Sequence, residues 1–316
     1  MNLIDAYRYL AALEQHRHFG RAAAACHITQ PALSNALRAL EANLKVAIVR
    51  RGRQYEGLTP EGEQVLATAH RVLHEQELLQ QALAGSAEAP RGRLVIGTVP
   101  TAMPIAARFA ARLVALHPGL VPQVRSLASQ EIEQGLDALA IDLGLGYTDR
   151  LGALRGGRLQ PWPQYVEHYH LLRRAPGGQA PLRFGAPMTW TEAATLPLAL
   201  LSPDMHNRVI LDQVFRGLAL QVAPALETNS VLALLVAVQS GALATVLPGS
   251  LVDTLAGQPG LEARPLTAPD LRTPIGFMTA TAVRPSRALE AALRLATDAA
   301  WLAEAAAHSG PLGAPG

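Results

Sequence analysis

Apolar residues recur at helical spacing in the first part of the chain and predict three short helices. The first helix runs from Leu3 into the stretch 16–19, and the second follows Gly20. The third begins directly after Thr29, because the hydroxyl of this residue can cap a helix and Pro31 fits the first helical turn. The first 44 residues are therefore expected to form a compact helical unit.

The third predicted helix has one apolar face and one polar face. The apolar residues are Ala32, Leu33, Ala36, Leu37 and Leu40, with Leu44 just beyond, and the polar residues are Gln30, Ser34, Asn35 and Arg38. Amide, hydroxyl and guanidinium groups on an exposed helix can bond to base edges in the major groove. Two helices joined by the turn 26–28 form the helix-turn-helix unit of many DNA-binding proteins, although an ordinary helical hairpin has the same periodicity.

The segment 49–58 favours DNA binding over an ordinary hairpin. An apolar pair is followed by Arg50, Arg51 and Arg53 around a glycine turn, which is typical of a β-hairpin wing. Arginines at such a tip can reach phosphates or the minor groove beside a recognition helix.

A long helix is expected from Pro60, capped by Thr59, to about Ala84. It carries a seven-residue apolar repeat at Val65, Val72 and Leu79, flanked by Leu66, Ala69, Leu73 and Leu83. Such a stripe is typical of a seam between paired helices, so a dimer is expected. Packing of the stripe on its own chain is the alternative. The segment 85–92 then has the composition of a linker.

Beyond residue 92, short apolar segments alternate with helical patterns. The expected strands are 94–98, 121–125, 142–146, 198–201, 245–247 and 275–279, and the expected helices are 105–117, 129–140, 207–217 and 231–241. This alternation predicts two α/β lobes with mostly parallel sheets, and the stretches 148–163 and 261–272 are the expected crossings between them. The end of the chain, from residue 306, is expected to be a disordered tail.

Charge is divided unevenly along the chain. Residues 1–58 carry eight basic side chains against four acidic ones, a net charge of +4, whereas the remainder carries 19 against 21. A small basic head suits a polyanion partner. Neither a membrane span nor a secretory signal is evident, so a cytoplasmic protein without a membrane partner is expected. Cys26 is the only cysteine, which excludes a disulfide within the chain.

Four segments together resemble the DNA-binding signature of LysR-type transcriptional regulators in order and spacing: 19–26, 29–41, 50–53 and 58–62. The resemblance implies an α/β fold with a winged helix-turn-helix domain (1–59), a dimerisation helix with hinge (60–92), and a two-lobed effector domain (93–305) similar to type 2 periplasmic binding proteins. Lobe I would comprise 93–162 and 267–305, and lobe II 163–266. The implied DNA-contacting residues are Thr29, Gln30, Pro31, Ser34, Asn35 and Arg38, with Arg51 and Arg53 in the wing.

The same resemblance implies double-stranded DNA, a small-molecule effector and RNA polymerase as partners, with assembly to a homodimer or homotetramer. One position departs from the family pattern. Lys45 stands where a glycine is usual, so the turn after the recognition helix has to close without glycine, which costs less if Asn43 is left-handed.

Ligands of two-lobed α/β folds lie between the lobes, at the carboxyl ends of strands and the amino ends of helices. The residues expected there are Thr98, Pro100, Thr101, Ser129, Tyr147, Thr148, Ser202 and His206. Hydroxyls and free N–H groups suit a small organic anion, so a carboxylate-bearing effector is the hypothesis. Plain helix capping is the alternative for each residue.

An enzyme is the first rival interpretation, and the sequence lacks its motifs. There is no P-loop, no complete dinucleotide fingerprint and no nucleophile elbow. The histidine pairs 16/18 and 168/170 lack a third ligand nearby in sequence, so no catalytic residue, metal or cofactor is expected. The second rival is a solute-binding module of a transport system. Such proteins carry an export signal and lack a basic head, whereas this chain has the basic head and no evident export signal.

Overall fold

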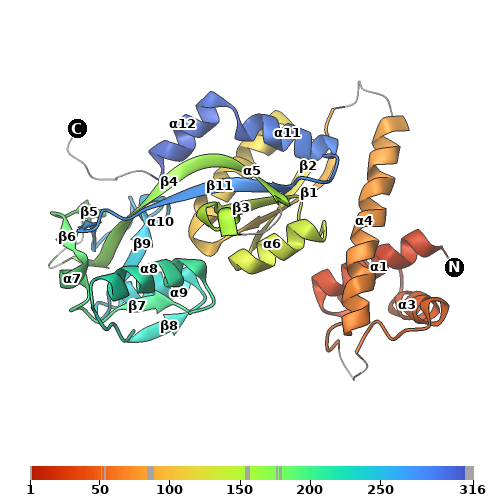
Figure 1. The fold of residues 1–316 in the computed structure, drawn as a ribbon, viewed down its shortest axis with the longest axis horizontal. Coiled ribbons are helices and arrows are strands. Elements are labelled where there is room, and N and C mark those ends of the chain that lie inside the picture. Colours follow the sequence, from red (N-terminus) through yellow and green to blue (C-terminus); the bar gives the residue numbers. More distant parts are fainter. Residues whose placement is uncertain are drawn as a thin grey trace. The chain divides into compact units, whose positions relative to one another are not determined.

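The protein is described by a computed structural model that covers residues 2–50, 52, 55–83, 89–153, 157–175, 177 and 180–309. The chain divides into two compact units, one of residues 1–88 with 137–140 and one of residues 89–136 with 141–316. Each unit has its own hydrophobic core, and each is described by itself (Figure 1).

Four helices form the described part of the N-terminal unit: α1 (Leu3–His16), α2 (Phe19–Ala25), α3 (Gln30–Leu44) and α4 (Pro60–Leu83). Leu10 and Leu13 of α1 pack in one buried cluster with Leu33 and Leu40 of α3. The Thr29 hydroxyl caps α3 by accepting from the Ala32 amide, as the sequence predicts. The three helices near the start of the chain thus have the order and bounds expected of a helix-turn-helix domain.

Lys45, and not Asn43, takes the left-handed conformation that ends α3. Its φ is 57° and its amide donates to the Glu41 carbonyl, while Asn43 stays inside the helix. The expectation about Asn43 was therefore wrong. A residue that is neither glycine nor asparagine adopts this conformation at a cost of roughly 1 kcal/mol, which the hydrogen bond at the helix end offsets.

The connection between α3 and α4 is held by side chains of the two helix ends. Val49 and Leu58 form an antiparallel bridge, and one carboxylate oxygen of Glu41 accepts from the amides of Ile48 and Val49 at 2.8 and 3.1 Å. The Thr59 hydroxyl accepts from the Gly62 amide, which caps α4. The bridge matches the base of the predicted wing, whereas Arg51 and Arg53 lie outside the described residues.

The apolar stripe of α4 is divided between two environments. Its first half packs on the N-terminal unit itself, through the residues Val65, Leu66, Ala69, Val72 and Leu73. Leu79 and Leu83, near the other end of the helix, are 60% and 79% exposed. Packing within the chain therefore accounts for the first half of the stripe, and the second half is uncovered in the single chain.

A mixed sheet runs through the C-terminal unit, in the order β2-β1-β3-β11-β4-β10-β5, with β6 paired to β10 and β9 paired to β4. The strands are β1 (Gly92–Thr98), β2 (Leu120–Ser126), β3 (Leu143–Tyr147), β4 (Leu159–Arg174), β5 (Arg183–Phe184), β6 (Met188–Thr189), β9 (Thr245–Pro248), β10 (Leu261–Thr267) and β11 (Arg272–Ala280). A separate pair joins β7 (Ala199–Leu201) to β8 (Leu226–Thr228). β11 is antiparallel to both β3 and β4, and β9 and β10 are antiparallel to β4. The remaining strand pairs are parallel, so the expected parallel pairing is present and is joined by antiparallel pairs around β4 and β11.

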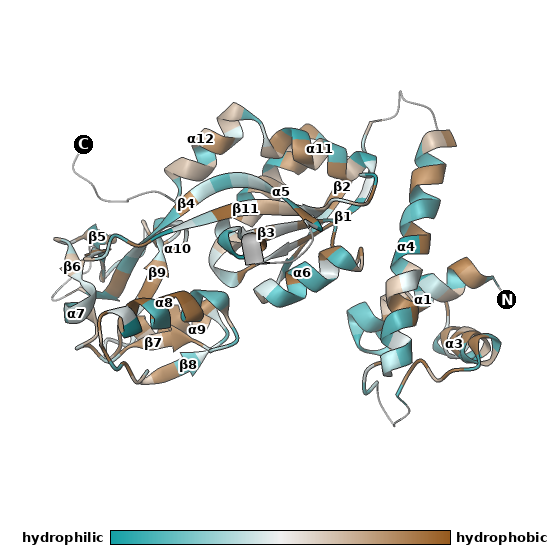
Figure 2. Ribbon diagram, in the orientation of Figure 1, coloured by the Kyte–Doolittle hydropathy of each residue, from teal (hydrophilic) through white to brown (hydrophobic). Residues whose placement is uncertain are grey.

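Helices cover the sheet (Figure 1). They are α5 (Met103–Leu116), α6 (Ser129–Asp137), α7 (Trp190–Ala193), α8 (His206–Gly217), α9 (Val231–Gln239), α10 (Gly249–Asp253), α11 (Arg287–Ala296) and α12 (Ala299–Ala307), with short 3-10 helices η1 (Pro100–Ala102) and η2 (Asp149–Ala153). Phe109, Phe277 and Trp301 stack edge to face or tilted at the centre of the main core. Strands β7 and β9 are coloured hydrophobic in Figure 2, which agrees with their complete burial.

The two lobes share β4. Residues 159–168 of this long strand pair with β11 in lobe I, and residues 169–174 pair with β9 and β10 in lobe II. One crossing therefore lies inside β4, beyond the expected stretch 148–163, because antiparallel pairing lets a strand continue from one lobe into the other. The second crossing joins β10 to β11, within the expected stretch 261–272.

Residue 306, the expected start of a disordered tail, still belongs to the fold. Helix α12 continues to Ala307, and the buried Ser309 hydroxyl donates to the Ala305 carbonyl, so residues 306–309 are part of the fold. Residues 310–316 lie outside the described part. None of the described helices is both long enough and apolar enough to cross a membrane.

Candidate functional site

The outer face of α3 is the first candidate site. Leu33, Leu37 and Leu40 are buried, and the side chains of Gln30, Asn35 and Arg38 are exposed. The Arg38 guanidinium donates to the Asn35 carboxamide at 3.3 Å, one turn away. The two side chains are thus neighbours on the exposed part of the helix, and both residue types can bond to base edges.

The other predicted DNA-contacting residues of this unit frame these exposed side chains. Thr29 and Pro31 are exposed at the start of α3, where the Thr29 hydroxyl is engaged in capping, and Ser34 is half-buried. Arg50 is exposed at the base of the wing. The start of α3 and the beginning of the wing thus present polar groups on the described surface.

A small cavity between the lobes is the second candidate site. Lobe I contributes Pro100 and Thr101 of η1, Ser129 of α6 and Tyr147 of β3, and lobe II contributes His206 and Asn207 of α8. The remaining lining residues are Val99, Ala128, Leu201 and Met205. The cavity has room for about one water molecule. Helices α6 and α8 both begin at it, one from each lobe, so their positive ends meet there.

Polar atoms facing this region lack protein partners among the described residues. They are Ser129 Oγ, Ser202 Oγ, His206 Nε2 and Asn207 Nδ2, each shielded from solvent. The amide nitrogen of Asn207 can only donate, and the serine hydroxyls can donate or accept. Helix α8 also has no side-chain cap at its start. Buried donors without acceptors cost about 1–3 kcal/mol each, so the cavity favours a ligand that supplies acceptor atoms.

His206 presents a donor to the cavity because of its neighbour Arg150. The guanidinium of Arg150 lies 2.9 Å from His206 Nδ1 and is itself paired with Glu133 at 3.0 Å. Since a guanidinium can only donate, Nδ1 accepts and the ring proton is placed on Nε2. Burial, and then the charge of Arg150, lower the pKa of His206, so the ring is neutral at pH 7. The Nε2–H group is one of the unpartnered donors.

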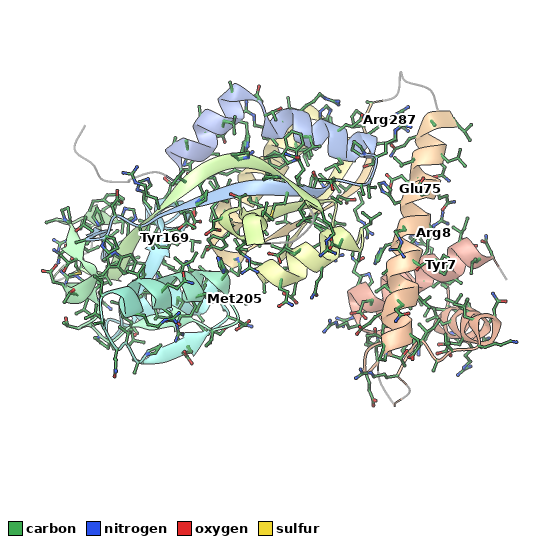
Figure 3. The ribbon with its side chains drawn as sticks, in the orientation of Figure 1. Tyr7, Arg8, Glu75, Tyr169, Met205 and Arg287 are labelled. Carbon is green, nitrogen blue, oxygen red and sulfur yellow. The ribbon has the colours of Figure 1, made fainter. Side chains whose placement is uncertain are left out.

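A buried carboxyl group, that of Glu167, lies beside Tyr147 where β4 passes from one lobe to the other. Glu167 of β4 is fully buried between Tyr165 and Tyr169, which share its face of the strand (Tyr169 is labelled in Figure 3). One of its oxygens accepts from the Tyr169 hydroxyl at 3.4 Å, and the other has no partner among the described residues. Burial raises the pKa of Glu167 to about 8, so this carboxyl is mainly protonated at pH 7.

An open groove adjoins the small cavity and shares Pro100, Ala128 and Met205 with it. Met205 precedes α8 in lobe II (Figure 3). The groove continues along the start of α5 and of α9, between residues of both lobes. Cavity and groove are therefore neighbours between the lobes, with these three shared residues as their common border.

The structure brings five of the eight residues predicted for the effector site to the cavity: Pro100, Thr101, Ser129, Tyr147 and His206. The Ser202 hydroxyl is buried nearby without lining it. Thr98 is enclosed at the end of β1, where its hydroxyl donates to the Val99 carbonyl, and the Thr148 hydroxyl donates to the Pro274 carbonyl in β11. Both threonines therefore have structural hydrogen bonds away from the cavity.

Sequence reasoning missed three residues of this region. Asn207 follows the predicted His206 directly and could have been found as the next residue of the same helix start. Glu167 lies two residues from both Tyr165 and Tyr169, a spacing that places all three on one face of a strand, but the sequence does not show that this face is buried. No sequence signal identifies Arg150, because its position depends on the fold of η2.

Two family descriptions match the chain. "Bacterial regulatory helix-turn-helix protein, lysR family" matches residues 4–63, and "LysR substrate binding domain" matches residues 87–301. The hydrogen peroxide-inducible genes activator of Dickeya chrysanthemi is 40% identical over 104 residues, which cover 33% of this chain and 34% of the relative. The chain thus spans about a third of the length of that curated relative. The relatives are named as gene regulators, and the expectation that the chain is not an enzyme is confirmed.

Solved structures show the same fold over nearly the whole chain. Full-length OxyR from Pseudomonas aeruginosa, in a variant form, superposes with a TM-score of 0.67 at 24% identity, covering 97% of this chain and 98% of that one. Full-length CbnR in complex with its target DNA has a TM-score of 0.62 at 17% identity, covering 96% and 99%. The expected architecture of a winged helix-turn-helix, a long helix and a two-lobed α/β domain is confirmed.

Proposed function

The chain belongs to the LysR family of bacterial helix-turn-helix regulatory proteins, and from this premise we propose that it is a transcription regulator controlled by a small organic anion. In this proposal α3 reads operator DNA and the interlobe site binds the effector. The protein acts in the cytoplasm, where the DNA is, as a dimer or tetramer that works with RNA polymerase. The fold similarity to CbnR in its DNA complex supports the placement of α3 at the DNA.

The observation that carries the DNA-binding proposal is the set of exposed polar side chains on α3, Gln30, Asn35 and Arg38, in a segment, residues 1–58, with a net charge of +4. We assign base contacts to these side chains and to Ser34, and positioning contacts to Thr29, Pro31, Arg51 and Arg53. Base contacts give sequence specificity, whereas contacts to phosphates act equally on all sequences.

The substitution Arg38→Ala tests the assignment. If the guanidinium bonds to a base, binding to a selected operator duplex is expected to weaken by about 1–3 kcal/mol, with a smaller change on a scrambled duplex. Fluorescence anisotropy at several salt concentrations measures both affinities. Arg71→Ala is the matched control, because Arg71 is an exposed arginine on α4. Unchanged affinity of Arg38→Ala for both duplexes contradicts the assignment of α3 as the recognition helix.

The effector proposal rests on the excess of donors in the cavity. Asn207 Nδ2 and His206 Nε2 lack protein acceptors, the bond from Arg150 to Nδ1 keeps the ring proton of His206 on Nε2, and the uncapped start of α8 adds amide donors. Carboxylate oxygens would accept from these groups and from the Ser129 hydroxyl. A cationic ligand has no acceptor atom at its charged end, and a neutral ligand accepts weaker hydrogen bonds than a carboxylate does, so both would satisfy these donors less well.

Calorimetry of the full chain with a panel of small carboxylates, amides and amines tests this proposal. Carboxylates are expected to bind, and Asn207→Asp is expected to weaken them more than tenfold, because a carboxylate of the same shape replaces the amide donor and repels the ligand. Asn43→Asp makes the same change in the N-terminal unit and serves as the control. Binding of neutral or cationic compounds without binding of any acid contradicts the proposal.

A response to peroxide through a cysteine pair is not part of the proposal, although the named relatives are peroxide-inducible gene activators. Cys26 is the only cysteine of the chain and lies at the end of α2 in the N-terminal unit. Burial raises the pKa of its thiol, which lowers the thiolate fraction and hence its reactivity.

A further inference from the structure

The shape of the interlobe site limits what the effector can be. The inner cavity has room for about one water molecule, so it accepts at most the carboxylate end of a ligand. Everything else in the ligand has to lie in the adjoining groove, which is reached past Pro100, Ala128 and Met205. The chemistry of the groove therefore decides which carboxylates fit.

The groove has a mixed lining of apolar and polar residues, and the charged residues in it are acidic. Its apolar lining includes Met103, Pro104, Leu127, Met205, Val231 and Leu251. Among the described residues that line it, the charged ones are Glu131 and Asp204, both of them acidic and exposed. No base is available in this lining to pair with a second negative charge on the ligand. A second carboxylate would therefore lie near two like charges, with no basic side chain in this lining to pair with it.

Resting on the proposed function, we infer that the effector is a monocarboxylate with an extended apolar body and no second negative charge. Its carboxylate accepts from His206, Asn207 and Ser129 at the inner end. Its hydrocarbon part covers the apolar lining of the groove, where burial of each methylene group tightens binding roughly fourfold. With hydrogen-bond donors at the inner end and acidic side chains at the outer end, the ligand binds in one orientation, with its carboxylate at the inner end.

Four ligands separate the parts of this inference in calorimetry of the full chain. Hexanoate, adipate and hexanamide have the same six carbons and carry one, two and no negative charges. Acetate keeps the single charge and lacks the apolar body. Hexanoate is expected to bind on the order of a hundredfold more tightly than acetate. Adipate is expected to bind at least tenfold more weakly than hexanoate, because its second carboxylate reaches the acidic groove.

The outcomes distinguish the inference about the ligand's shape and charge from the proposed function of the cavity as an anion site. Adipate or acetate binding as tightly as hexanoate overturns the inference about the body and the single charge, and leaves an anionic effector intact. Hexanamide binding as tightly as hexanoate overturns the proposed function of the cavity as an anion site. Failure of hexanoate to bind at all overturns the assignment of an extended monocarboxylate.

Variants of Asp204 give a second, independent measurement, because this residue is exposed and lies two residues before the start of α8. Asp204→Asn and then Asp204→Lys are expected to tighten adipate stepwise, while hexanoate changes less than twofold. Thr254→Asn, at the far side of the same groove, is the control for a change of side chain without a change of charge. A constant ratio of adipate to hexanoate affinity across the variants contradicts the role given to the groove charges.

Discussion

Glu167 is the residue whose environment differs most from what its chemistry prefers. Its carboxyl is fully buried on β4 between two tyrosines, and one oxygen has no partner among the described residues. The pKa of this carboxyl is raised by burial from 4.5 to about 8. The unfolded chain ionises Glu167 above pH 4.5, whereas the folded chain keeps it protonated up to about pH 8. Between these two values, rising pH therefore favours the unfolded state.

Replacement of Glu167 by glutamine is expected to stabilise the C-terminal unit at neutral and alkaline pH. Glutamine has the shape of the protonated carboxyl and cannot ionise, so the variant escapes the loss of stability that the wild type suffers as pH rises. The difference in unfolding free energy is expected to grow by about 1.4 kcal/mol per pH unit between pH 5 and 8, and to level off above.

Urea unfolding followed by tryptophan fluorescence measures this difference, because Trp162, Trp190 and Trp301 all lie in the C-terminal unit. Glu75→Gln, at an exposed position of α4, controls for the loss of a carboxyl as such. A difference between Glu167→Gln and wild type that does not change with pH means that Glu167 is already ionised in the folded protein.

Among single residues, the sequence predicts best those whose position in the site follows from the ends of strands and helices. Thr101, Ser129, Tyr147 and His206 were identified because ligand sites lie where strands end and helices begin, and they do line the cavity. Glu167 could not be found in this way, since its role depends on which face of an unpredicted strand is buried. Which partners a side chain lacks is likewise a property of the folded molecule.

At the scale of secondary-structure elements, one side-chain hydroxyl, that of Thr59, links the start of α4 to the residues before it. Thr59 Oγ1 accepts from the Gly62 amide at 2.9 Å and donates to the Ala47 carbonyl at 2.6 Å. Gly62 is required there, because a Cβ atom at this position would come within 2.1 Å of the Ile48 carbonyl oxygen. The start of α4 and the base of the wing are therefore joined by close backbone packing and one side chain.

Thr59→Ala is expected to destabilise this junction by about 1–2 kcal/mol, since the amide of Gly62 loses its acceptor and the Ala47 carbonyl loses a donor. Thr59→Ser keeps the hydroxyl and is expected to behave nearly as the wild type. Hydrogen exchange of the full chain measures the effect: peptides covering residues 55–70 should exchange roughly tenfold faster in the alanine variant only. Equal exchange in both variants would assign the stability of the junction to packing alone.

The elements themselves divide into those with a local signal and those without one. The start of helix α3 was located to the residue, because Thr29 and Pro31 mark it and the apolar residues that follow have a helical period. Strand β4 was missed, because Pro161 and Pro163 interrupt the first part of a run whose pairing is with distant strands. The antiparallel contacts of β11 with β3 and β4 are equally non-local, and they convert the expected parallel sheet into a mixed one.

For the molecule as a whole, the exposed end of α4 bears on assembly. The first half of the apolar stripe is used inside the N-terminal unit, whereas Leu79 and Leu83 remain 60% and 79% exposed one helical turn apart. Leucines on such a helix are typical of a seam that pairs with a second copy. Two paired chains would present two recognition helices to half-sites separated by about one or more turns of DNA.

Leu79→Lys combined with Leu83→Lys is therefore expected to shift the protein towards the monomer and to weaken operator binding. Two charges at the seam repel their counterparts in a paired chain, while lysine preserves helix formation. Gln81→Lys is the matched control, since residue 81 lies on the opposite side of α4 from both leucines. Sedimentation equilibrium over a range of concentrations measures the association, and anisotropy measures DNA binding. If the double variant associates as strongly as the control, the exposed leucines of α4 do not form the seam, and dimerisation has to be assigned to the C-terminal unit.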